Sequence, residues 1–217
     1  SSEYFAFMTN NNNNLVEIRR YAEKASQSQE RIMRAKSASE LRDAWEEFVW
    51  HFAKCIGRQI SSGLGDQRSR GWAHRLKNAS NGGDPGLFFL REARNAVEHG
   101  LTPFAEFNEP AVHIGGNLVR LEGGGSVTMV DCTFNGTPMG SFHVSTSGGR
   151  VDSIIGQPNI SIEQVPRTIS LVTISNPEKG VSVDVPIGLA GKTLESGRPD
   201  DLAELGVAFL YESLEDL

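Results

Sequence analysis

Apolar residues recur every three to four positions through the first hundred residues, which is the spacing of amphipathic helices. The pattern predicts helices over residues 15–37, 39–60, 67–79 and 84–99. The second of these is the clearest, because Leu41, Trp45 and Phe52 fall on one face. Ser39 can cap its first turn. The polar residues 26–29 interrupt the first helix, so we expect it to bend or break there.

The pattern changes after residue 102, where glycines multiply and β-branched residues begin to alternate with polar ones. We predict strands over residues 112–121, 126–134, 141–145, 151–155, 159–165, 168–175 and 181–185, glycine turns at 123–125, 135–136 and 148–149, and a last helix over 200–217. The sequence therefore predicts an α+β protein. An all-α helical bundle over residues 15–102 is followed by a β-rich domain over 103–217 that ends in a helix. Residues 1–14, with their asparagine run, are predicted to be a disordered leader.

The fourth predicted helix has both ends marked. Asp84 suits the N-cap, Pro85 the first helical position, and Gly100 the left-handed residue just past the end. On a helical wheel, the apolar arc carries Phe89, Leu90, Ala93, Ala96 and Val97. The opposite arc carries Arg91, Arg94, Asn95, Glu98 and His99. The helix dipole at the C-terminal end favours the protonated imidazole of His99, which can handle a proton or a phosphate near neutral pH.

The run Arg94-Asn95-Ala96-Val97-Glu98-His99 resembles the Arg-x4-6-His signature of HEPN domains, in which a polar residue often follows the arginine. The longer phrase DPGLFFLREARNAVEHG resembles the closing helix of bacterial HEPN-like proteins that carry an extra C-terminal domain. The resemblance covers about residues 15–101. It implies a HEPN-like helical bundle, a homodimer, and metal-independent endoribonuclease activity on single-stranded RNA without a cofactor.

The same resemblance implies roles for individual residues. His99 from two subunits would transfer protons, Arg94 from both would neutralise charge on phosphorus, and Asn95 would orient the scissile group or His99. Two copies are needed because one histidine and one arginine are too few to supply a base, an acid and cations. Phe88 lies on the polar arc, and a dimer contact would explain a large apolar ring there.

Other interpretations of these residues stay open. The spacing alone is weak, since Arg68 and His74 also match it. Arg94 and Glu98 can be a plain surface ion pair, and His99 a partner of the helix dipole without chemistry. The alternative function is a catalytically inactive HEPN-type module that binds nucleotide, RNA or protein and dimerises. A third is a structural or phage-assembly-type protein without a small ligand.

A basic stretch precedes the fourth helix. Its cations are Arg68, Arg70, Arg75 and Lys77 around Trp72, and with Arg91 they are candidate RNA-binding residues. The alternative is a short helix that buries Trp72 and leaves the cations in solvent.

Charge and composition narrow the choice of partner and compartment. The net charge of −6 combines 15 basic and 12 acidic residues in 1–100, a net of +3, with 6 basic and 15 acidic residues in 101–217, a net of −9. The N-terminal part is therefore where an anion would bind. The sequence has no run of 18 apolar residues and no signal-peptide pattern, so we expect a cytoplasmic protein. It has no cluster with zinc spacing, so we expect no metal. We expect Cys55 and Cys132 to be buried free thiols. Toxin-like HEPN proteins often have a neutralising partner protein, and the resemblance implies one here.

Overall fold

Helices come first in the structure and strands second. The structure, a computed structural model, describes residues 2–99, 105–116, 118–166, 168–176 and 180–215. The helices are α1 (Ser2–Arg34), α2 (Ala38–Gly65), α3 (Arg70–Asn78), α4 (Pro85–Glu98) and α5 (Pro199–Leu214), with an irregular helical turn η1 (Ala79–Gly83) before α4. Within the described residues no strand precedes Ala105. The predicted α+β class is confirmed.

The strands form several small sheets. They are β1 (Ala105–Asn108), β2 (Ala111–Ile114), β3 (Val119–Glu122), β4 (Gly124–Phe134), β5 (Thr137–Ser147), β6 (Arg150–Gly156), β7 (Ile162–Val165), β8 (Thr168–Leu171), β9 (Ile174–Asn176), β10 (Val181–Val183), β11 (Gly188–Leu189) and β12 (Lys192–Thr193). Two sheets have three strands, in the orders β3-β2-β7 and β4-β5-β6. The other strands pair as β1-β8, β9-β10 and β11-β12.

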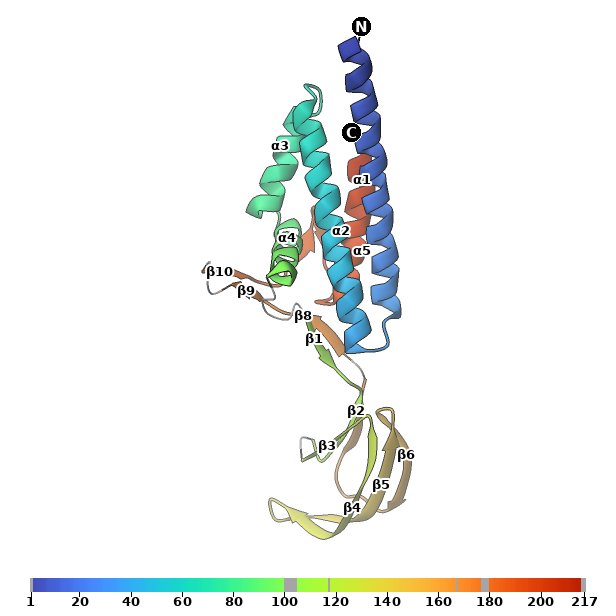
Figure 1. The fold of residues 1–217 in the computed structure, drawn as a ribbon. Coiled ribbons are helices and arrows are strands. Elements are labelled where there is room, and N and C mark those ends of the chain that lie inside the picture. Colours follow the sequence, from blue (N-terminus) through green and yellow to red (C-terminus); the bar gives the residue numbers. More distant parts are fainter. Residues whose placement is uncertain (1, 100–104, 117, 167, 177–179, 216–217) are drawn as a thin grey trace. The chain divides into compact units, whose positions relative to one another are not determined.

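The chain divides into two compact units that differ from the predicted division at residue 103. The helical unit comprises residues 1–105 and 170–217, and the β unit comprises residues 106–169. The difference arises because α5 packs against α1 and α2, as Figure 1 shows, and so belongs to the helical unit. A local pattern of apolar residues gives no sign of which distant helices a final helix will contact.

The first two helices are longer than predicted. α1 begins at Ser2, within the predicted leader, and it continues through the polar stretch. There, Ser28 is buried and its hydroxyl donates to the carbonyl oxygen of Lys24 at 3.0 Å, so no break is needed. α2 is capped by Ser37 rather than Ser39, because the Ser37 side chain accepts from the backbone N–H of Glu40 at 3.2 Å. It continues past its predicted end at residue 60 to Gly65.

The core of the helical unit is built on α2. The predicted apolar face of this helix is confirmed, and its buried members are Leu41, Ala44, Trp45, Phe48, Val49, Phe52, Cys55 and Ile56. Burial raises the pKa of the Cys55 thiol to about 12, so this cysteine is inert. Cys132, by contrast, is only half-buried rather than buried as predicted.

One buried polar pair joins α2 to α5. The Gln59 amide donates from Nε2 to the Ser213 hydroxyl at 2.9 Å, and that hydroxyl donates to the carbonyl oxygen of Leu210 at 2.8 Å. Gln59 is fully buried and Ser213 is 4% exposed. Because neither side chain can reach water, each depends on the other to satisfy its polar atoms.

Asp84 fixes the start of α4 as predicted. Its Oδ1 accepts from the backbone N–H of Leu87 at 2.9 Å, which is an N-cap bond, and Pro85 follows at the first helical position. Its Oδ2 accepts from the backbone N–H of Ala190 at 2.8 Å, in the turn between β11 and β12. Gly86 lies against the same hairpin, since a Cβ on it would be 2.6 Å from the carbonyl oxygen of Gly188. The predicted role of Gly100 lies outside the described residues.

The β unit has a core of its own. Val112, Ile114, Phe142 and Val144 are buried in it, with half-buried apolar residues around them. The predicted strand over 112–121 is two strands, β2 and β3, paired antiparallel with Ile114 opposite Val119. The chain reverses between them at Gly115 and Gly116, whose φ angles of 63° and 66° favour glycine.

The buried amide–hydroxyl pair yields a stability prediction. Ser213→Ala leaves the buried Gln59 amide with only the weak acceptor Cys55 Sγ, 3.7 Å from Nε2, so we expect the free energy of unfolding to fall by about 1–3 kcal/mol. In Gln59→Leu/Ser213→Ala neither polar group remains, and we expect a value within about 1 kcal/mol of the wild type. Urea denaturation followed by helical circular dichroism measures both. Ser80→Ala is the control, because its similarly buried hydroxyl bonds only to the nearby carbonyl of Lys77. A double variant less stable than Ser213→Ala would contradict this account.

The two hydrogen bonds of Asp84 give a second prediction about stability. Asp84→Ala removes both, so we expect a loss of about 1–3 kcal/mol in the free energy of unfolding. Asp84→Asn keeps one oxygen acceptor and should lose about half as much. Asp43→Ala, at an exposed position on α2, is the control. If Asp84→Asn were as damaging as Asp84→Ala, charge rather than the pair of hydrogen bonds would be responsible.

Candidate functional site

The polar arc of α4 is organised by Glu92. This carboxylate accepts from Arg91 at 3.0 Å (Nε) and 2.7 Å (Nη2), and from the Asn95 amide at 3.2 Å. Its side chain is only 12% exposed, so water competes little for these bonds. Glu92 therefore sets the positions of two of the predicted site residues.

Arg94 has partners one and four residues further along the helix. It forms an ion pair with Glu98 and donates to the Asn95 side-chain oxygen at 3.3 Å. The pair with Glu98 matches the plain interpretation weighed from the sequence. It is half-exposed, with side chains 28% and 39% exposed, so it stabilises the helix only weakly.

A groove of about 550 Å³ lies beside this arc, between α1, α2 and α4. Its lining residues are Tyr21, Ala53, Lys54, Gly57, Arg58, Ser61, Arg91, Arg94 and Asn95. The structure thus brings three predicted site residues, Arg91, Arg94 and Asn95, to one surface. It adds two cations from α2, Lys54 and Arg58.

The lining of the groove contains four cations and no carboxylate. Three of these cations have a glutamate partner at its edge: Arg91 with Glu92, Arg94 with Glu98, and Arg58 with Glu17 at 3.2 Å. The Lys54 ammonium lies 5.3 Å from the centre of the Trp50 ring. An anion in the groove would therefore contact cationic side chains, of which three already have a carboxylate partner.

His99 is not among the groove residues. It ends α4, where its backbone N–H donates to the carbonyl oxygen of Asn95 at 3.1 Å, and its side chain is exposed. The structure brings Arg94 and Asn95 together and leaves the imidazole outside the groove of the same chain. On the opposite side of α4, Phe89, Leu90, Ala93 and Ala96 are buried as predicted, whereas Val97 is half-buried.

The four cations of the basic stretch also lie outside the groove lining. Arg68, Arg70, Arg75 and Lys77 are exposed, on α3 and just before it. Trp72 is half-buried and its ring packs close to Gly63 of α2. This matches the short helix with solvated cations that was the alternative for this stretch.

Phe88 has an intramolecular neighbour. The guanidinium carbon of Arg91 lies 5.0 Å from the centre of the Phe88 ring, and the ring is half-buried. A cation over an aromatic face is a favourable contact. The presence of this ring on the polar arc therefore needs no dimer contact to explain it.

Five polar residues of the site were not predicted from the sequence: Tyr21, Lys54, Arg58, Ser61 and Glu92. A signal for three of them was present. Lys54, Arg58 and Ser61 are spaced by four and three residues, which places them on one face of α2 away from its apolar stripe. Which helix this face meets could not be read from spacing.

A histidine lies near the groove but is not cationic. The His51 ring centre is 6.2 Å from that of Tyr21, which lines the groove. Burial, and then the charge of Lys24, lowers the pKa of His51 below its usual value, so its imidazole is neutral at pH 7. This neutral ring adds no charge to the groove.

The described residues contain no cluster of three or more His, Cys, Asp or Glu side chains placed to hold a metal ion. Nor is any helix among them both long and apolar enough to cross a membrane. Comparison with protein-family models, with curated proteins and with solved structures found no match to the chain. The function must therefore be argued from the groove itself.

The charge of the groove is testable with inorganic tripolyphosphate. We expect Lys54→Gln/Arg58→Gln to weaken its binding at least about 10-fold, because both cations face the groove. Arg68→Gln/Lys77→Gln removes the same charge outside the groove, where salt screens it, and should weaken binding less than about 2-fold. Isothermal titration calorimetry in about 0.15 M salt, where the Debye length is about 8 Å, measures both. Equal losses in the two variants would show that net charge alone matters.

Proposed function

We propose that this protein is a HEPN-type, metal-independent endoribonuclease that cleaves single-stranded RNA and works as a homodimer. The observation that carries the proposal is that Arg91, Arg94 and Asn95 line one groove with Lys54 and Arg58. A cationic groove of this kind suits a flexible polyanion. The Arg-x4-His resemblance adds the proton-transfer group, His99.

The groove cations would hold the RNA backbone, and Arg94 would act on the scissile phosphate. Its pair with Glu98 is half-exposed, so a phosphate can replace the carboxylate at small cost. Asn95 lies beside Arg94 and is held by Glu92, which would fix its amide for orienting the scissile group. Glu92 is in this scheme a positioning residue.

The proton transfers require imidazoles. One removes the proton of the 2′-hydroxyl, whose oxygen attacks phosphorus, and the P–O5′ bond breaks as a second imidazole protonates the leaving oxygen. The products are a 2′,3′-cyclic phosphate and a 5′-hydroxyl. Since His99 is exposed and lies outside the groove lining of its own chain, we infer that a two-fold dimer brings His99 of both copies to one scissile phosphate, where one is the base and the other the acid.

A second candidate is a HEPN-type binding module without catalysis. The position of His99 favours it, because the groove lining of one chain contains cations but no imidazole. Such a module would bind RNA, nucleotide or a protein partner through the same groove. It differs from the nuclease in needing no contribution from His99.

Cleavage of end-labelled single-stranded RNA in EDTA tests the proposal. We expect weak cleavage that leaves 2′,3′-cyclic phosphate ends. His99→Ala should lower the rate by about 10²–10⁴ with fold and dimer unchanged, and Arg94→Ala should also nearly abolish cleavage. Arg68→Ala and His74→Ala, at the second pair with the same spacing, are the matched controls and should act through affinity alone.

Two outcomes would overturn the nuclease proposal. Equal activity of the wild type and His99→Ala would show that any cleavage came from a contaminant. RNA binding without cleavage, together with loss of binding in Lys54→Gln/Arg58→Gln, would select the binding module instead.

A further inference from the structure

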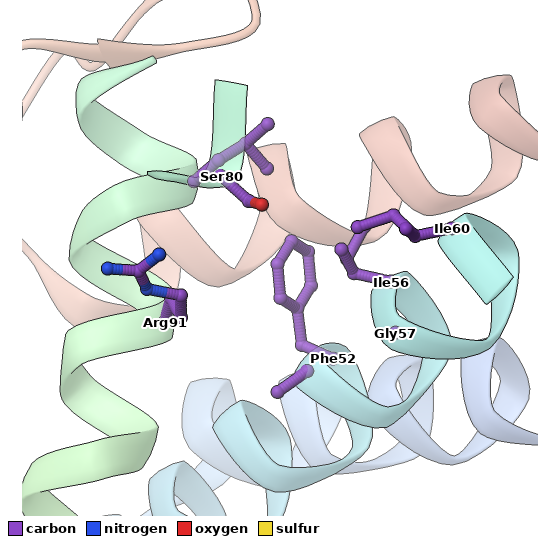
Figure 2. Close-up of a pocket in the computed structure, with 8 residues that line it drawn as sticks. Phe52, Ile56, Gly57, Ile60, Ser80 and Arg91 are labelled. Atoms are coloured by element: carbon purple, nitrogen blue, oxygen red, sulfur yellow. The ribbon is translucent and has the colours of Figure 1, made fainter. Parts of the chain in front are cut away.

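A second, apolar pocket opens beside the groove. It has a volume of about 150 Å³ and is lined by Phe52, Ala53, Ile56, Gly57, Ile60, Ser80, Leu87 and Arg91. Figure 2 shows Phe52, Ile56 and Ile60 of α2 on one side, Ser80 of η1 above and Arg91 of α4 opposite. Ala53, Gly57 and Arg91 line both this pocket and the cationic groove, so the two adjoin.

The size and walls of the pocket define what fits. An apolar cavity of about 150 Å³ lined by aliphatic and aromatic side chains holds a molecule the size of benzene. The one hydroxyl in the lining, that of Ser80, already donates to the carbonyl oxygen of Lys77 at 3.0 Å. The pocket therefore offers little to the polar edges of a nucleobase and suits an apolar ring or a short branched alkyl group.

Gly57 keeps the entrance of the pocket open. A glycine inside a helix destabilises the helix relative to other residues, yet Gly57 lies within α2. Two other helix glycines have packing reasons: a Cβ on Gly63 would be 2.8 Å from that of Ala73, and one on Gly206 would be 3.1 Å from the Phe48 ring. A Cβ on Gly57 would meet nothing within 4 Å. Its missing side chain leaves open space where the pocket and the groove meet.

Arg91 places a positive charge at the mouth of the pocket. Glu92 and Asn81 hold its guanidinium on one side, and the Phe88 ring lies 5.0 Å away. Its side chain is 36% exposed, so part of it faces solvent. Beyond it, Lys54 and Arg58 continue the positive charge along the groove. Apolar walls thus lead directly to cations.

We propose that this pocket binds a small amphipathic anion. A benzene-sized apolar group would fill the space between Phe52, Ile56 and Leu87, and a carboxylate or phosphate attached to it would lie in the groove near Arg91. The site is independent of the nuclease proposal, because it involves neither His99 nor cleavage. Its occupant would cover part of the groove, and so would compete with any longer anion there.

Phenyl phosphate is the probe, with benzyl alcohol and inorganic phosphate as its apolar and anionic halves. By calorimetry or NMR titration we expect phenyl phosphate to bind with a Kd on the order of 1 mM, at least about 10-fold more tightly than either half. In the wild type, the methyl resonances of Ile56 and Ile60 should shift with phenyl phosphate and benzyl alcohol but not with inorganic phosphate.

Gly57→Leu fills the pocket while improving the helix. We expect phenyl phosphate and benzyl alcohol to bind at least about 10-fold more weakly, with Tm raised by about 2–4 °C because leucine favours a helix over glycine. Gly65→Leu is the matched control, since a Cβ there also meets nothing within 4 Å but the residue lies outside the pocket. It should leave binding unchanged.

Several results would overturn the proposal. One is unaltered phenyl phosphate binding in a folded Gly57→Leu. Others are equal affinity for phenyl phosphate and one of its halves, or no shift of the Ile56 and Ile60 methyls. The methyl readout uses the wild type, so it decides the matter even if Gly57→Leu fails to fold. Methyl shifts caused by oligouridylate alone would reassign the pocket to a nucleobase.

Discussion

The position of α5 against α2 is the constraint on which the candidate site depends. Gln59 and Ser213 are 154 residues apart in the sequence, and both are buried where these helices meet. A buried amide tolerates little sliding, because a shift of one residue would break its bonds. The pair therefore fixes how α5 lies along α2.

The position of α5 also affects the packing of α4, through one small residue. A Cβ on Gly206 of α5 would lie 3.1 Å from Phe48, 3.3 Å from Phe52 and 3.4 Å from Leu90. Side chains of α2 and α4 thus converge on the backbone of α5. Because α4 carries Arg91, Arg94 and Asn95, the C-terminal helix helps set the groove without contributing a residue to it. The β11–β12 hairpin adds a second restraint at the start of α4 through Asp84.

Local signals in the sequence were enough for the helices and their faces. The cap at Asp84 and the apolar stripe of α2 depend on residues within a few turns, so periodicity and residue type predict them. The groove could not be predicted in this way, since Lys54 of α2 and Arg94 of α4 meet only through tertiary packing. Gln59 and Ser213 illustrate the same limit, because polar residues on amphipathic helices ordinarily face water. The Ser37 cap shows that an individual hydrogen bond can decide where a helix begins.

The two arginine pairs on α4 differ in a way that bears on both proposals. Glu92 is 12% exposed and binds Arg91 through two nitrogens, so this pair is held in place and keeps a charge at the mouth of the pocket. Glu98 is 39% exposed and binds Arg94 through one nitrogen, so an incoming anion can displace the Glu98 carboxylate. The groove thus combines a fixed cation with an exchangeable one. A fixed cation beside an apolar pocket suits recognition of a small ligand, and an exchangeable cation suits a charge that develops or arrives during turnover.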